Sequence, residues 1–134
     1  MGRLVIKLAP KERVLINGAV IENGDRRARI SIISGESNIL RLKDAIHPEE
    51  ATTPVRRVCY ATQLVLTGDT DPESSRLSLL RRIEELSQVF SDPDSRASLA
   101  LATNALMSNQ HYKCLKALRS LLPREDRLLA VRSA

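Results

Sequence analysis

The pattern of hydrophobic and polar positions divides the chain into a strand-like first third and a helical remainder. From Arg3 to Leu42, apolar residues recur with a period near two and turn residues interrupt them at short intervals, which predicts an antiparallel β-meander. Asn17-Gly18 and Asn23-Gly24 are two of these breaks. Because Asn-Gly tolerates the positive φ angles of a two-residue type I′ turn, each pair predicts a hairpin. The expected strands span 3–8, 13–16, 19–22, 28–34 and 38–42.

Helix-forming residues predominate beyond Lys43, and apolar positions there recur at helical spacing. Thr53 followed by Pro54 is typical of an N-cap and a first helical residue, which predicts a helix over 53–66. The β-branched residues of the same stretch leave a strand open as the alternative. The apolar side of this helix is expected to comprise Val55, Val58, Cys59, Thr62, Val65 and Leu66.

Further helical segments follow a turn-rich linker at 68–72. The apolar stripe of the first segment comprises Leu79, Ile83, Leu86 and Phe90. Asp92 with Pro93 predicts the start of the next helix, and Asn109 marks the break before another. The segment after Pro123 is rich in arginine and acidic residues, so we expect a frayed tail there.

These segments together predict an α+β fold, with an N-terminal antiparallel β-meander of about five short strands followed by a C-terminal bundle of about four helices. We assign 1–46 to a β-sheet region and 47–134 to a helical region, both within one compact unit, because 134 residues are typical of a single domain. Such a chain can bury a core without a metal or a disulfide. Cys59 and Cys114 lie outside any metal-binding spacing, so we expect reduced thiols.

Neither targeting signals nor catalytic motifs stand out in the chain. The N-terminus lacks the features of a signal peptide and no apolar run could cross a membrane, so the expected location is the cytoplasm, without membrane contact. His47 and His111 have no partner at ligand spacing, and Glu49-Glu50 fits the preference for acids at a helix N-terminus. No phosphate-binding loop or nucleophile motif occurs. We therefore expect no enzyme activity, no cofactor and no metal.

Charge narrows the classes of partner. The formal net charge is +5, with 11 basic against 7 acidic residues up to Gly68 and 10 against 9 beyond it. A basic excess in the first half permits a polyanionic partner such as nucleic acid. The chain has three aromatic residues, Tyr60, Phe90 and Tyr112, which is too few for a base-stacking platform. An RNA-binding function would therefore depend on arginines and backbone groups.

Two basic clusters are the candidate contact sites. The first is Arg26, Arg27 and Arg29; in a strand, Arg27 and Arg29 would share one face and Arg26 would lie on the other. In the second cluster, Arg56-Arg57 follow Thr52-Thr53, where a helix N-terminus with unpaired N–H groups could bind phosphate. For both clusters the alternative is a solvated surface or ion pairs, for example from Arg56 or Arg57 to Asp25 or Glu50.

The same two motifs resemble the FlbT family, the flagellar biosynthesis repressors of alphaproteobacteria. The matching residues are Ile16 to Val20, Asn23 to Arg27, Glu49 to Pro54, Arg56, Arg57, Tyr60 and Gln63. The resemblance implies a post-transcriptional repressor that associates with the 5′ untranslated region of flagellin mRNA and promotes its degradation, in balance with the activator FlaF. It makes candidate RNA contacts of Arg26, Arg27, Arg29, Thr52, Thr53, Arg56 and Arg57.

A protein-interaction module or chaperone that binds flagellin or FlaF, with an indirect effect on mRNA, is the alternative function. Its basis is the run Leu99–Met107, which is apolar nearly all round and needs burial on more than one side. Burial between neighbouring helices of the same chain would also satisfy this run. A homodimer through the edge strand at 3–8 is a further alternative.

Overall fold

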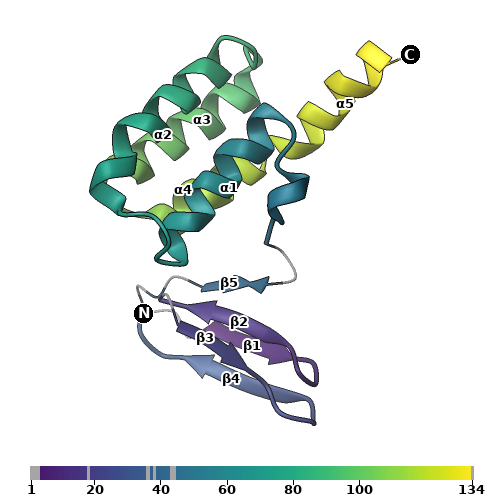
Figure 1. The fold of residues 1–134 in the computed structure, drawn as a ribbon, viewed down its shortest axis with the longest axis vertical. Helices are drawn as coiled ribbons and strands as arrows, with labels where there is room; N and C mark the ends of the chain where they lie inside the picture. Colours follow the sequence, from purple (N-terminus) through teal and green to yellow (C-terminus); the bar gives the residue numbers. More distant parts are fainter. Residues whose placement is uncertain (1–3, 18, 36, 38, 43–44, 134) are drawn as a thin grey trace. The chain divides into compact units, whose positions relative to one another are not determined.

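The structure, a computed structural model, describes residues 4–17, 19–35, 37, 39–42 and 45–133 (Figure 1). It contains two compact units, Met1–Ala45 and Ile46–Ala134. The first unit holds the strands and the second the helices, which confirms the α+β class. The inclusion of both in one compact unit stays a prediction.

The N-terminal unit contains short antiparallel strands in two sheets. They are β1 (Leu4–Leu8), β2 (Arg13–Ile16), β3 (Ala19–Glu22), β4 (Ala28–Ile32) and β5 (Ile39–Arg41). Strand β1 pairs with β4, and β2 lies between β3 and β5. Among the described strands only β2 and β3 are both consecutive and paired, so the five strands are as predicted but their connection is not a meander.

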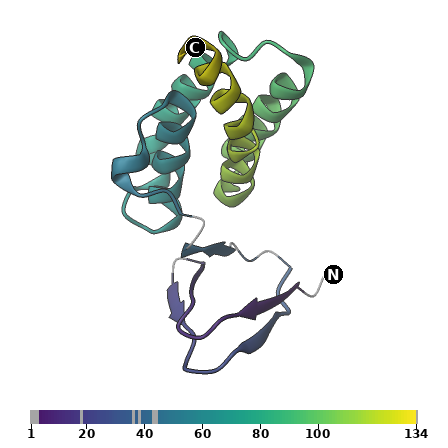
Figure 2. The same ribbon diagram turned by 90° about the vertical axis from the view of Figure 1, so that its right-hand side faces the viewer.

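A shared core explains this strand order. Apolar side chains from both sheets meet there: Ile6, Leu8, Val14 and Ile39 are buried, with Ile16, Ile30 and Ile32 packed against them. Alternate residues of a strand face the same side, so Ile6 and Leu8 of β1 point together into this core, as do Val14 of β2 and Ile39 of β5. Leu15 and Leu40, on the opposite face of the second sheet, are buried as well. Pairing β1 with the distant β4 gives two small sheets that cover each other's apolar faces, and Figure 2 shows the strands arranged around this interior.

The two Asn-Gly pairs have different roles. Asn17 has a φ of 49°, and Ile16 lies opposite Ala19, so the first pair forms a two-residue hairpin connection as predicted, although Gly18 lies outside the described residues. Asn23-Gly24 leads from β3 to β4, which belong to different sheets. The hairpin predicted there is wrong, because burial of the two apolar faces decides the strand pairing.

The second unit is built from α-helices, and α1, α2 and α3 each begin at a proline that follows a capping residue. A short 3-10 helix η2 (Pro48–Glu50) precedes α1 (Pro54–Leu66), α2 (Pro72–Ser87), α3 (Pro93–Met107), α4 (His111–Arg119) and α5 (Leu122–Ser133). Thr53, Asp71 and Asp92 each cap a helix and accept a hydrogen bond from a backbone N–H three residues later. The helix predicted at 53–66 is confirmed and its strand alternative is excluded.

Helices α1 to α4 form the predicted four-helix bundle. Each packs against the next, and α4 closes the ring against α1 (Figure 1). The stripe predicted on α2 is buried, with Leu79, Ile83, Leu86 and Phe90 each at most 3% exposed. On α1 the predicted apolar side is buried except for Leu66, which is half-buried.

The prediction of a frayed tail after Pro123 is wrong. Residues 122–133 form helix α5, which extends past the bundle (Figure 1). Leu121, just before it, and Glu125 are buried. Arg124 Nε lies 2.9 Å from Asp92 Oδ1, at the start of α3. These contacts fix the first turns of α5, because a buried acid with polar partners is costly to release.

Candidate nucleic-acid interface

The segment with Arg26, Arg27 and Arg29 is positioned by Asn23. Asn23 Nδ2 donates to Ala9 O at 2.8 Å and to Arg26 O at 2.9 Å. The backbone around it is paired as well, since Asn23 N donates to Glu12 O at 2.8 Å. The family-like Asn23 therefore ties the arginine segment to the β1–β2 turn, and this defines where the arginines lie.

All three arginines of the first cluster are exposed, and two of them line one groove. Arg27 and Arg29 line a groove of about 520 Å³ in the N-terminal unit, together with Lys7 and Arg41. The two side chains predicted to share a face do lie together. Strand β4 begins only at Ala28, so Arg26 precedes the strand and does not line the groove.

Cross-strand pairing brings two like charges face to face in this groove. Lys7 on β1 lies directly opposite Arg29 on β4. Directly opposed side chains in an antiparallel pair lie on one face and are close, so like charges there destabilise the sheet. In contrast, Arg13 on β2 faces Glu22 on β3 and its Nε lies 2.9 Å from Glu22 Oε1. The repulsion at Lys7 and Arg29 would be relieved by a bound anion.

An acid in the same groove neutralises only one of its cations. Arg41 Nε lies 3.5 Å from Glu12 Oε2, and the Arg41 guanidinium also donates to Lys7 O. The side chains of Lys7, Arg27 and Arg29 make no hydrogen bond or ion pair within the part of the chain that the structure describes. Three cations of the groove are thus left for an external partner.

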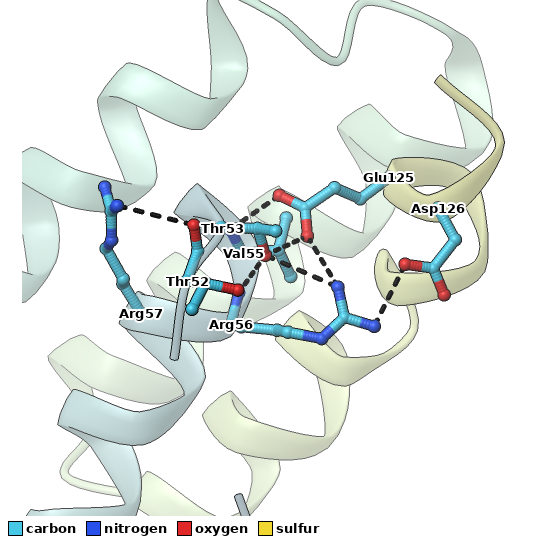
Figure 3. A network of polar contacts seen from close by, with 7 residues as sticks. All are labelled: Thr52, Thr53, Val55, Arg56, Arg57, Glu125 and Asp126. Carbon is cyan, nitrogen blue, oxygen red and sulfur yellow. Dashed lines mark hydrogen bonds and ion pairs between the residues drawn. The ribbon is translucent and has the colours of Figure 1, made fainter. Parts of the chain in front are cut away.

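The second predicted cluster, at the start of α1, is already occupied by an acid of the same chain (Figure 3). Glu125 on α5 is 4% exposed. Its Oε2 accepts from Val55 N at 2.9 Å, its Oε1 accepts from the Thr53 hydroxyl, and Arg56 Nη1 lies 3.4 Å from Oε1. The amide, hydroxyl and guanidinium donors expected to bind phosphate therefore bind a carboxylate.

Arg56 and Arg57 consequently differ in what they can do. Arg56 Nη2 also lies 2.9 Å from Asp126 Oδ1, so both terminal nitrogens of its guanidinium group, Nη1 and Nη2, face α5. The partners suggested from the sequence, Asp25 and Glu50, are not those of Arg56. Arg57 points away from α5 (Figure 3), is exposed, and makes a single side-chain bond of 3.4 Å to Thr52 O. Of the second cluster, Arg57 and Thr52 remain exposed.

Gln63, another residue of the family-like motif, has a structural role. Its side chain accepts from Ile46 N at 2.8 Å and donates to Ile46 O at 3.0 Å. Next to it, Glu50 Oε1 accepts from His47 N at 3.0 Å. The two bonds of Gln63 hold the segment before α1 against that helix, so this side chain fixes the backbone at Ile46.

The two thiols are buried in the helical bundle. Burial raises the pKa of Cys59 to about 12 and that of Cys114 to about 11. A thiol with so high a pKa is protonated and unreactive near neutral pH. Both cysteines are free, and their burial makes them part of the core.

Most of the apolar side chains in the run Leu99–Met107 are buried within the chain itself. Leu99, Ala102, Ala105 and Leu106 are buried between helices of the bundle. Leu101 and Met107 are 64% and 54% exposed. Burial within the chain therefore accounts for one side of this helix, and two large apolar side chains remain on the other.

Sequence reasoning missed Lys7 and Glu125. Lys7 has no distinguishing sequence signal except its interruption of an apolar strand, and its importance comes from pairing with a strand that begins 21 residues later. Glu125 lies 70 residues after Val55 and resembles any acid of a polar helix. No local pattern identifies either partner, because both pairings are set by tertiary packing.

The fold and this groove define a small α+β protein with a basic groove in which Lys7, Arg27 and Arg29 have no side-chain partner among the described residues. No helix in the described part of the chain has the length and apolar character needed to cross a membrane. The family model described as flagellar protein FlbT matches residues 4–129. No solved structure matches.

Named relatives agree with this match over nearly the whole chain. A probable flagellum biosynthesis repressor protein FlbT of Caulobacter sp. (strain K31) is 32% identical, covering 94% of this chain and 95% of its own. One of Rhodopseudomonas palustris (strain TIE-1) is 35% identical, covering 95% and 98%. The chain belongs to the FlbT family. The family predicted from the sequence is confirmed, and these relatives are named as probable flagellum biosynthesis repressors.

Proposed function

We propose that this protein represses flagellum biogenesis after transcription, by binding the 5′ untranslated region of flagellin mRNA and promoting its degradation. The observation that carries the proposal is the groove in which Lys7 faces Arg29 beside Arg27, with none of the three cations paired within the described residues. Family membership supports the repressor role, and the sequence resemblance supplies the RNA target.

Phosphate contacts would supply most of the affinity. Each guanidinium or ammonium group that neutralises a phosphate releases a counterion from the RNA. A plot of the logarithm of the binding constant against the logarithm of the salt concentration therefore has a negative slope, of about −0.7 per phosphate contact for single strands. Three contacts from Lys7, Arg27 and Arg29 would give a slope of about −2. The affinity should therefore be strongly salt-dependent.

Recognition would depend on RNA shape. Tyr60 and Tyr112 are half-buried and Phe90 is 3% exposed, so these aromatic side chains offer no flat stacking surface. A folded leader could present closely spaced phosphates to the groove, and the backbone contacts would then read their arrangement. Nuclease chemistry is left to another protein in this proposal.

A leader-RNA titration with paired variants tests the proposal. Arg27→Ala with Arg29→Ala should weaken binding about 10-fold or more and reduce the salt slope by about 1.4, because two phosphate contacts are lost. The matched control is Lys11→Ala with Arg13→Ala, which removes two charges of the same unit that already have the ion-pair partners Asp25 and Glu22. Equal weakening by both pairs would indicate a general charge effect and reject the groove.

The effect on mRNA has its own test. A reporter transcript with the flagellin leader should have a shorter half-life when the wild-type protein is present than when the Arg27→Ala/Arg29→Ala variant is. A reporter with an unrelated leader serves as the control. If both reporters decay alike with either protein, repression does not proceed through the leader.

A protein partner such as flagellin or FlaF is the second candidate, with an indirect effect on mRNA. It is favoured by the exposed side chains of Leu101 and Met107 on α3. Purification of the protein from ribonuclease-treated lysate distinguishes the two functions. Retention of flagellin or FlaF after the treatment favours the protein partner, and their loss favours RNA.

A further inference from the structure

A second basic groove lies between α1 and α2 of the helical unit. It has a volume of about 510 Å³ and three arginines in its wall, Arg57, Arg81 and Arg82. Pro54, Ser78, Glu85, Leu86 and Val89 complete the lining. Of the three arginines, Arg57 belongs to the family-like motif, whereas Arg81 and Arg82 lie on α2 outside it.

The cations of this groove lack partners within the described chain. The side chains of Arg81 and Arg82 make no ion pair or hydrogen bond there, and Glu85 lies four residues from Arg81 without pairing to it. Arg57 has only its 3.4 Å bond to Thr52 O. Three cations against one acid give the groove a positive potential that favours an acidic partner.

Apolar surface accompanies these charges. Leu86 is buried at the groove, and Val89, just past the end of α2, is 64% exposed. Leu77 is 74% exposed and lies one helical turn before Arg81. Exposed apolar side chains thus lie on both sides of Arg81 and Arg82 along the chain, with Leu77 before them and Val89 after them. Arginine with apolar anchors is typical of protein interfaces.

We propose that the α1–α2 groove binds an acidic amphipathic segment of a partner protein. The segment's carboxylates would pair with Arg57, Arg81 and Arg82, and its apolar side chains would cover Val89 and Leu77, as in recognition of a helix in a groove. An RNA strand would pair with the arginines but leave the apolar ends uncovered, and Glu85 would repel its phosphates. The inference is independent of the RNA interface at Lys7, Arg27 and Arg29.

Fluorescence anisotropy on the full chain tests this site with defined probes. The probe is a labelled synthetic helical peptide of about 15 residues with leucines along one side and glutamates beside them. Its two controls replace the glutamates by glutamines or the leucines by serines. A uridine oligonucleotide serves as competitor. The wild-type protein should bind the acidic leucine peptide with a Kd of about 100 µM or tighter and both control peptides about 10-fold more weakly.

Charge reversals locate the binding. Arg81→Glu with Arg82→Glu should weaken the peptide complex about 10-fold, because both side chains are exposed and the fold does not need them. The matched control is Lys113→Glu with Lys116→Glu on α4, which lies across the bundle from α2. Retained affinity in the α4 variant supports the α1–α2 groove.

Four results would overturn the inference. They are absence of peptide binding at about 1 mM, equal binding of the glutamine peptide, equal loss in the α4 variant, and displacement of the peptide by the uridine oligonucleotide. The last of these would reassign the groove to RNA. None of these four results depends on whether the Arg27→Ala/Arg29→Ala variant binds leader RNA. The peptide-binding proposal and the RNA-binding proposal can therefore be rejected independently of each other.

Discussion

The arginines that follow Asn23-Gly24 and those that follow Thr53-Pro54 are similar in sequence, yet they have different surroundings. The first group leads into a strand edge of a small sheet, where Lys7 faces Arg29 and neither side chain has an acidic partner within the described residues. In the second, Arg56 faces a buried carboxylate. A basic motif therefore predicts a contact surface only if the fold does not provide its anion.

The physical difference lies in the donors around each motif. A helix N-terminus has several unpaired N–H groups, and these must be satisfied when the helix end is buried. Glu125 does this for α1. A strand that is already paired has no such requirement, so arginines beside it can remain free for a partner. Three predictions test this comparison and one tests the buried thiols of the helical unit, in order from the largest expected effect to the smallest.

Glu125→Ala should lower the free energy of unfolding by about 3 kcal/mol, because it leaves Val55 N, Thr53 and Arg56 without their acceptor in a buried place. Glu125→Gln keeps the size of the side chain and one acceptor, and should cost about half as much. Urea denaturation measures both. A loss below about 0.5 kcal/mol for the alanine variant would mean that α5 is not fixed by this carboxylate.

Alkaline pH should destabilise the helical unit through its two thiols. Their pKa is about 12 for Cys59 and about 11 for Cys114 in the folded chain, against 9.0 for a free thiol. Between pH 9 and 11 the unfolded thiols ionise while the folded ones keep their protons, so the free energy of unfolding falls by about 1.4 kcal/mol per pH unit for each thiol. Below pH 9 this contribution to stability is fully present.

The comparison for this pH effect is a Cys59→Ala/Cys114→Ala variant, which should lose stability at neutral pH but decline less steeply above pH 9. Denaturant titrations at a series of pH values give both slopes. Parallel slopes for the two proteins would show that the thiols ionise equally in the folded and unfolded chains.

Arg56→Ala and Arg57→Ala should have different effects on stability, although the two arginines are neighbours on one helix. Removing Arg56 should cost about 1–2 kcal/mol, since Glu125 loses a charged partner in a buried place. Removing the exposed Arg57 should change stability by less than about 0.5 kcal/mol. Thermal and urea unfolding of the two variants side by side provide the measurement, and equal losses would refute the distinction.

Arg29→Glu should have the smallest effect on stability, in the opposite direction. A glutamate opposite Lys7 replaces a like-charge pair by an opposite-charge pair, so we expect a gain of about 0.5 kcal/mol. The same variant should bind leader RNA about 10-fold more weakly. Glu22→Lys is the reverse control, because it creates a like-charge pair with Arg13 and should destabilise the other sheet by a similar amount. If Arg29→Glu destabilises the protein, Lys7 and Arg29 do not repel each other.

Much of the helical unit could be predicted from local patterns. Thr53-Pro54 and Asp92-Pro93 mark helix starts because capping and the fixed φ of proline act within one turn. The stripe of Leu79, Ile83 and Leu86 is buried because one face of a helix must cover a core. The tail was predicted wrongly, since α5 is stabilised by Asp92 and Arg56, which lie far away in the sequence.

The candidate site could be predicted only in part. Arg27 and Arg29 were placed together by strand alternation, which is local. Their facing partner Lys7 depends on β1 pairing with β4, and the Asn23-Gly24 pair had predicted a different neighbour. Local turn preference is worth little against burial of the apolar faces of two sheets, so the core decided the pairing.

The sequence by itself determined the α+β division of this protein, the ends of its main helices and its family, because periodicity, caps and family motifs are written in neighbouring residues. Only the tertiary structure decided which arginines stay available. Packing brought Glu125 to the start of α1, where it neutralises Arg56, and placed Lys7 opposite Arg29, where neither cation has an acidic partner within the described residues.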